Sequence, residues 1–200
     1  MRHVYKPGNT NRALVLFHGT GGGPEDLMGI ASFLDSQSPV VAFEGDVDEN
    51  GTKRFFKRLK PGVFDEEDLV NRTHALDRTL HSIEERYDLP VNKMVLLGYS
   101  NGANIIASYL KLYGKKVSGA FLFQPMTPFK SFTYDDLSDL PVFLSAGNND
   151  PIVSSEDSKR LIEALQKSGV TLQPLWHDDG HMLSKGTIYE ARAFFKKHWG

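Results

Sequence analysis

Short apolar runs of strand length alternate with segments of helical period along this sequence, and that alternation constrains the fold most. The run ALVLF at residues 13–17 has no polar alternation, which is typical of strands buried on both faces of a parallel sheet. The segment at residues 67–87 repeats apolar residues every three or four positions, as an amphipathic helix does. Strands are predicted at residues 13–17, 40–43, 93–97, 120–123, 142–145 and 171–176, and helices at residues 24–34, 67–87, 102–112, 155–167 and 187–199.

This order of elements predicts an α/β fold with a mostly parallel central sheet, helices on both faces and right-handed crossovers. The length of 200 residues, without an internal repeat or linker, predicts a single domain over residues 1–200 and no large cap domain. Residues 44–62 and 124–139 interrupt the alternation, and both stretches follow predicted strands. Ligands bind beyond the carboxyl ends of such strands, so we expect both long loops to contribute to a site; loosely ordered surface excursions are the alternative.

Composition excludes several classes of function. The chain has no cysteine, which excludes disulfides, thiolate metal sites and cysteine nucleophiles. A formal net charge of −2 offers no electrostatic footprint for nucleic acid or an anionic membrane. No apolar run approaches the roughly 18 residues of a membrane span, and the polar start is unlike a signal peptide, so a cytoplasmic protein is expected.

The pentapeptide GYSNG at residues 98–102 points to a nucleophile. It matches G-x-S-x-G, in which a serine occupies a sharp, strained turn between a strand and a helix and the glycines avoid clashes. The pattern alone is only moderately specific, but here the apolar run KMVLL precedes it and the helical segment ANIIASYL follows it. We therefore predict that Ser100 is the nucleophile; the alternative is a glycine-rich turn whose serine only caps the helix.

A serine nucleophile needs a general base, and in this fold the chain order is serine, acid, histidine. His181 is favoured as the base because its segment DDGH forms a turn between a predicted strand and a predicted helix. His177 follows the strand directly and is interpreted as a polar strand end, and His198 is expected on a solvated face of the last helix. No metal site is expected at His177 and His181, because a turn containing glycine lacks the helical face that such ligands usually share.

Asp150 is favoured as the acid that orients the histidine. It follows the strand at residues 142–145 by a short loop and precedes a proline, which places its carboxylate above the edge of the sheet. Asp178 and Asp179 are nearer to His181 in sequence, but such neighbours usually point away from an adjacent side chain, and we expect them to cap the turn.

Acyl transfer also needs backbone N–H groups that stabilise the tetrahedral oxyanion. One such donor follows the nucleophile, here Asn101, and the other comes from the loop after an early strand. The segment HGTGGG at residues 18–23 fits that loop, with Thr20 as the second donor and His18 in a structural role. A phosphate-binding loop is the alternative, but the segment lacks both the Lys-Ser/Thr of a P-loop and the GxGxxG spacing.

An apolar pocket beside the serine is expected to bind the substrate. Its candidate residues lie in or near the two long loops and beyond the strand ends: Phe55, Phe56, Phe64, Met126, Ile152 and Met182, with Arg54 for a polar group of the substrate. The alternative for each aromatic residue is that it packs a loop onto the domain.

The segments HGTGG, GYSNGAN, NNDPIV and DDGH, in this order, resemble the small phospholipase/carboxylesterase branch of the α/β-hydrolases. Within that branch the chain is similar to the MhqD/YodD-type bacterial carboxylesterases, which RFFKRLKPGVFDEEDL at residues 54–69 matches closely. The resemblance covers essentially the whole chain. It implies an α/β-hydrolase fold, a Ser100–Asp150–His181 triad, an oxyanion hole at Thr20 and Asn101, and hydrolysis of short-chain carboxylic esters.

Two other groups share this outline. Acyl-protein thioesterases place Leu after the His-Gly pair and Gln after the nucleophile, where this chain has Thr20 and Asn101, so a long-acyl protein substrate is not expected. Dienelactone hydrolases use a cysteine nucleophile, which this chain cannot supply. The expected function is a serine esterase for small, short-acyl esters, without metal or cofactor.

Alternatives remain open at this point. A non-catalytic protein of the same fold that senses a small ligand is one, and an acyl thioesterase or lysophospholipase is another. Nothing in the residues predicts self-association, although a homodimer is an open alternative for so compact an esterase.

Overall fold

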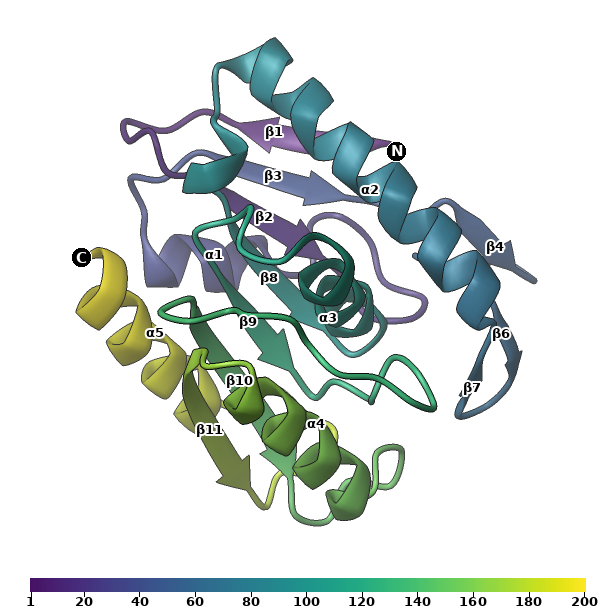
Figure 1. Ribbon diagram of the computed structural model, residues 1–200. Helices are drawn as coiled ribbons and strands as arrows, with labels where there is room; N and C mark the ends of the chain where they lie inside the picture. The colour runs from purple at the N-terminus through teal and green to yellow at the C-terminus, as the bar shows by residue number, and fades with distance from the viewer.

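The computed structural model describes residues 1–200 and shows a seven-stranded sheet between two layers of helices (Figure 1). The strand order is β1-β3-β2-β8-β9-β10-β11. Edge strand β1 (His3–Lys6) runs antiparallel to β3 (Val40–Phe43). The other neighbours pair in parallel, namely β3, β2 (Leu14–Phe17), β8 (Val95–Tyr99), β9 (Gly119–Phe123), β10 (Pro141–Gly147) and β11 (Thr171–His177). This arrangement confirms the predicted α/β fold.

Helices cover both faces of the sheet. On one face lie α2 (Glu66–Tyr87), α3 (Asn101–Tyr113) and α4 (Ser155–Lys167), and on the other lie α1 (Met28–Leu34) and α5 (Lys185–Trp199) (Figure 1). Strand β2 shows why its residues are all apolar: Val15 and Phe17 pack into the first layer, whereas Leu14 and Leu16 pack into the second. Each residue of the strand therefore faces a hydrophobic core, whichever way its side chain points.

Polar caps explain where several helices begin. The side chains of Asp65, Ser154 and Ser184 accept hydrogen bonds from backbone N–H groups in the first turns of α2, α4 and α5. The first helix was predicted from residue 24, but α1 begins at Met28. The difference arises because the residues before it form turns, in which the Asp26 side chain accepts a hydrogen bond from the N–H of Gly23.

The prediction of an irregular loop at residues 44–62 is wrong. Strands β4 (Val47–Glu49) and β5 (Thr52–Arg54) form one hairpin, and β6 (Arg58–Lys60) and β7 (Val63–Phe64) form another. The first hairpin turns at Asn50 and Gly51, whose φ angles are 55° and 83°. An Asn-Gly pair readily adopts these left-handed conformations and is a strong hairpin signal, which the many charged residues around it obscure.

Strand β1 was also missed, because this edge strand is only partly buried and lacks a continuous apolar run. A 3₁₀ turn (Val91–Lys93) precedes β8, so that strand begins two residues later than predicted. The stretch at residues 124–139 has neither helix nor strand. It is nevertheless attached to the body of the protein, since the N–H of Thr127 donates to the carboxylate of Asp157 in α4 and Tyr134 is buried.

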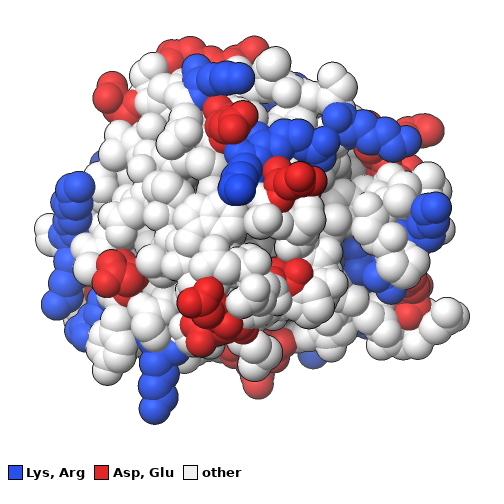
Figure 2. All heavy atoms as spheres, turned by 90° about the horizontal axis from the view of Figure 1, so that it is seen from below, with Lys and Arg blue, Asp and Glu red and all other residues white.

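Figure 2 shows acidic and basic side chains interspersed among uncharged residues over the face that is seen from below. No large field of one sign occupies that face. None of the helices combines the length and the apolar character that crossing a membrane requires.

Candidate active site

Ser100 occupies the turn between β8 and α3 in a strained backbone conformation, with φ 51° and ψ −112°. The flanking glycines are required by close backbone contacts. A Cβ on Gly98 would lie 2.5 Å from the carbonyl carbon of Gly102, and a Cβ on Gly102 would overlap the carbonyl oxygen of Phe17. The turn therefore exposes the serine side chain beyond the carboxyl end of a central strand, as a G-x-S-x-G turn requires.

The structure brings Ser100, His181 and Asp150 together from the ends of β8, β11 and β10. His181 Nε2 lies 2.9 Å from Ser100 Oγ, and His181 Nδ1 lies 2.6 Å from Asp150 Oδ2. The other carboxylate oxygen of Asp150 accepts backbone hydrogen bonds from Ile152 (2.7 Å) and Val153 (3.0 Å). When Nδ1–H donates a hydrogen bond to the carboxylate, the lone pair on Nε2 is free to accept the proton of the serine.

Two side chains hold the segment that carries His181. The Tyr99 hydroxyl donates to the carbonyl oxygen of His181 at 2.6 Å. Burial raises the pKa of the Tyr99 phenol, and the charge of Asp150 raises it further. Gln124, which is buried with a φ of 48°, donates from Nε2 to the carbonyl oxygen of Met182 at 3.2 Å.

The other candidate histidines and acids lie outside this arrangement. His177 ends β11 with its Nε2 atom 2.7 Å from Gln124 Nε2, and Asp178 accepts a hydrogen bond from Asn148. The expectation of a solvated His198 is wrong. Its ring packs 4.4 Å from that of Phe194, and burial lowers its pKa.

In the glycine-rich segment after β2, the three successive glycines use their backbone N–H groups within the protein, but Thr20 does not. The N–H groups of Gly21, Gly22 and Gly23 donate to Lys53, Gly19 and Asp26 respectively, whereas that of Thr20 donates to no protein atom. Asn101 is the first residue of α3, and the first N–H groups of a helix have no partner within it. Both residues predicted as donors line the cavity that Ser100 also lines.

A cavity of about 270 Å³ lies in front of the serine. Of the residues expected in the substrate pocket, Arg54, Phe64, Met126 and Ile152 line it. The remaining lining residues are Thr20, Arg58, Gly62, Tyr99, Ser100, Asn101, Asn104 and His181.

The expectation that Phe55, Phe56 and Met182 line the pocket is wrong. Phe55 and Phe56 are fully buried, because the chain turns inward after the first hairpin. Phe55 packs against the ring of Phe17 at 5.4 Å, and its N–H donates to the side-chain oxygen of Asn101. Met182 is 67% exposed and lies outside the cavity wall.

Sequence reasoning missed Arg58, Asn104 and the bridging role of Tyr99. Asn104 lies about one helical turn after Asn101, and its side-chain oxygen accepts the N–H of Met126 at 2.7 Å. The two asparagines thus attach the two long loops to the start of α3. The spacing of the two asparagines was the signal in the sequence that could have indicated this role. No residue near Tyr99 in the sequence indicated its contact with His181.

Two guanidinium groups face the cavity. Arg54 is only 3% exposed and donates to Thr20 Oγ1 at 2.6 Å and to the carbonyl oxygen of Phe56 at 3.2 Å. Arg58 Nε lies 2.9 Å and 3.0 Å from the two oxygens of Glu49, which is also 3.6 Å from Arg54. Burial lowers the pKa of Arg54, and Arg58 lowers it further while Glu49 opposes them; an arginine nevertheless remains charged at neutral pH. The cavity therefore carries more positive than negative charge.

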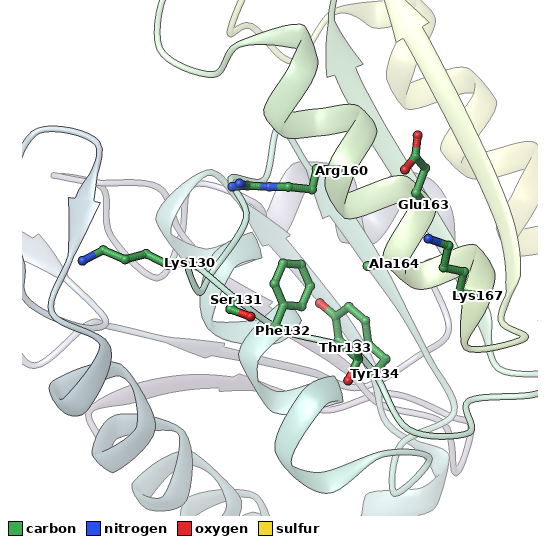
Figure 3. A pocket seen from close by; sticks show the side chains of 9 residues that line it. All are labelled: Lys130, Ser131, Phe132, Thr133, Tyr134, Arg160, Glu163, Ala164 and Lys167. Atoms are coloured by element: carbon green, nitrogen blue, oxygen red, sulfur yellow. The ribbon is translucent and has the colours of Figure 1, made fainter.

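A separate cavity lies between the loop after β9 and helix α4 (Figure 3). It shares no lining residue with the cavity of Ser100. Its basic side chains are exposed, and Arg160 pairs with Asp157 at 2.7 Å. Its lining residues are Lys130, Ser131, Phe132, Thr133, Tyr134, Arg160, Glu163, Ala164 and Lys167.

Comparison with known proteins identifies the family. The sequence model of the dienelactone hydrolase family matches residues 63–187 of this chain. This range contains the serine, the aspartate and the histidine described above. The chain belongs to this family. Membership does not bring a cysteine nucleophile, because the sequence contains no cysteine.

Individual proteins match this chain over nearly its whole length. MhqD of Bacillus subtilis is 40% identical over 197 residues, which cover 98% of each chain. The crystal structure of the Bacillus cereus carboxylesterase matches with a TM-score of 0.97 and 40% identity over 100% of this chain and 95% of its own. The structure of YahD with malic acid matches with a TM-score of 0.93 and 29% identity over 98% of each chain. These matches confirm the predicted α/β-hydrolase fold, and the chain is an ester hydrolase of the carboxylesterase type.

Proposed function

We propose that this ester hydrolase acts through Ser100, His181 and Asp150 on small, short-acyl carboxylic esters. The observation that carries the proposal is the chain of contacts from Ser100 Oγ through both nitrogens of His181 to Asp150. Ser100 Oγ attacks the ester carbonyl carbon while His181 Nε2 accepts its proton. The histidine then returns this proton to the leaving alkoxide, which departs as an alcohol and leaves an acyl-enzyme.

A second half-reaction regenerates the enzyme. His181 takes a proton from a water molecule, the resulting hydroxide attacks the acyl carbonyl, and the proton passes back to Ser100 as the carboxylic acid leaves. In both steps the backbone N–H groups of Thr20 and Asn101 stabilise the tetrahedral oxyanion. One such donor typically contributes about 2.7–4 kcal/mol to the transition state.

The cavity supports a small substrate with a polar group. Its volume of about 270 Å³ is just below the range usual for small-molecule sites, about 300–1,000 Å³. We propose that Arg54 binds a polar or anionic group of the ester, because its buried guanidinium faces the cavity beside Thr20. YahD, a structural relative, was solved with malic acid, which suits a small acid or its ester in such a cavity.

We also infer that residues 1–200 form one α/β-hydrolase domain. Strand β1 near the start and helix α5 near the end both belong to the same layered arrangement around one sheet. No second sheet with its own core interrupts it, since the two hairpins lie beside the sheet and Phe55 and Phe56 belong to its core.

The test is a Ser100→Ala variant assayed with p-nitrophenyl acetate. We expect kcat to fall by a factor on the order of 10⁶, as for nucleophile removal in serine hydrolases generally. Ser36→Ala, a change at an exposed serine between α1 and β3, should leave the rate unchanged. Full activity of Ser100→Ala would overturn the proposal.

A fluorophosphonate probe separates an enzyme from a ligand sensor of the same fold. The wild-type chain should be labelled at Ser100 and the Ser100→Ala variant should not. An unlabelled wild-type chain would favour the sensor. A higher kcat/KM for an acetyl thioester than for the matched ester would favour a thioesterase instead.

A further inference from the structure

An apolar cavity lies directly beside the one that contains Ser100. The two cavities share Thr20 and Tyr99 in their walls. Four apolar residues line the second cavity, Leu27 and Ile30 from the start of α1 and Leu183 and Ile188 around the start of α5; its other lining residues are Gly19, Gly22 and Asp26. No basic side chain lines it, whereas two arginines line the cavity of Ser100.

The apolar surface continues away from the serine between α1 and α5. Ile30 and Ile188 also line a third cavity, together with Gly29, Phe33, Lys185 and Tyr189. The rings of Phe33 and Tyr189 meet edge to face at 5.3 Å, and Tyr189 is 63% exposed. We call the series Leu27, Ile30, Leu183, Ile188, Phe33 and Tyr189 the α1/α5 strip.

Two observations connect the α1/α5 strip to the reaction. Apolar side chains that line adjoining cavities and are partly open to solvent commonly mark a binding site, and all members of the strip except the buried Leu27 are at least partly exposed. In addition, Thr20 lines both the cavity of the strip and the cavity of Ser100. A carbonyl carbon bound there carries two substituents that diverge from it. The Ser100 cavity, with its arginines, suits a polar substituent, and the other substituent then leaves past Thr20 and Tyr99 toward the strip.

We propose that the α1/α5 strip is a subsite for the apolar half of the ester, a linear alkyl or arylalkyl chain. This proposal rests on the proposed function, because it needs the ester carbonyl at Ser100. Since the acyl group of the proposed substrate is short, the apolar substituent along α1 and α5 is the alcohol half of the ester, longer than ethyl, and the polar substituent lies near Arg54.

The test measures kcat/KM for two series of esters, p-nitrophenyl esters from acetate to octanoate and acetate esters from ethyl to octyl. The acetate series should rise by about fourfold per added methylene, which corresponds to about 0.8 kcal/mol of apolar burial. A flat acetate series, or a rise in the acyl series alone, would overturn the proposal.

Variants at the two ends of the strip test whether longer chains extend further along it. Ile30→Asn, next to Thr20, should flatten the rise from the shortest chains onward. Tyr189→Ser, at the exposed far end, should reduce the rate only for the longest chains. Thermal unfolding checks that both variants fold, and Ile30→Ala serves as the milder change if Ile30→Asn lowers the melting temperature.

Leu59→Asn is the matched control, since Leu59 is 71% exposed in β6 and lies outside the strip. It should leave the chain-length dependence unchanged, and an equal flattening in this control would overturn the proposal. So would a dimer in light scattering that Tyr189→Ser dissociates with no change in chain-length dependence, because the strip would then be an interface between copies. Failure of Ser100→Ala to abolish hydrolysis would instead refute the catalytic proposal and is a separate result.

Discussion

Replacing Asp150 with asparagine tests the orientation of His181 with almost no change in shape. Asp150 Oδ1 accepts the N–H groups of Ile152 and Val153 at 2.7 Å and 3.0 Å. These two donors require an acceptor, so the oxygen of the new amide should take their place. The amide nitrogen then faces His181 Nδ1 across the present 2.6 Å contact.

That arrangement forces the wrong tautomer of the histidine. Nδ1 must accept from the amide, so the ring proton moves to Nε2, which now donates to Ser100 Oγ instead of accepting its proton. In a serine protease the equivalent change lowers kcat about 10⁴-fold. The expected loss for Asp150→Asn is the same, about 5 kcal/mol of transition-state stabilisation at 1.36 kcal/mol per tenfold.

The assay is steady-state hydrolysis of p-nitrophenyl acetate, with thermal unfolding of each variant as the check on folding. Asp178→Asn is the matched control, because Asp178 lies in the same histidine segment and accepts only from Asn148. Its kcat should equal that of the wild type. The reasoning fails if Asp150→Asn stays within tenfold of the wild type, or if Asp178→Asn shows the larger loss.

Three further predictions concern packing and pH. Gly102→Ala should destabilise the fold by about 3 kcal/mol or more, measured by urea unfolding, because its Cβ overlaps the rigid carbonyl of Phe17. Tyr99→Phe removes the 2.6 Å hydrogen bond to the carbonyl of His181, so unfolding should become easier by about 1 kcal/mol and kcat should fall more than KM rises. Burial raises the pKa of Tyr134 above that of an unfolded tyrosine, so its contribution to stability is complete below about pH 10 and is lost as pH rises above it. Urea unfolding from pH 8 to 11 should show this fall, and Tyr134→Phe should make it less steep; equal slopes would contradict the assignment.

Local signals were sufficient for much of the catalytic arrangement. The turn at Ser100 depends on two glycines within two residues of it, so its conformation is encoded where it occurs. Asp150 and His181 each follow a strand of a parallel sheet, and such strands bring their carboxyl ends to one edge. The sequence therefore determined the fold class and which serine, aspartate and histidine would meet at that edge.

Side-chain direction in the loops was decided only by tertiary packing. Arg54 and Phe55 are neighbours in sequence, yet one faces the cavity and the other is buried in the core. Their assignment depends on how the first hairpin docks onto α3 through Asn101, a contact between residues 46 positions apart. No periodicity within the loop encodes such a contact.

The α1/α5 strip also could not be predicted from the sequence, because its residues lie even further apart along the chain. Ile30 and Ile188 belong to helices near opposite ends of the chain, and each alone reads as an ordinary apolar position of an amphipathic helix. They form one surface because the helices near the two ends of the chain pack on the same face of the sheet, in which β2 and β8 are inner strands. The sequence alone determined which serine, aspartate and histidine meet, since that depends on short turns at strand ends. The tertiary structure decided what surrounds these three residues, because the walls of the cavities come from residues that meet only when the layers pack.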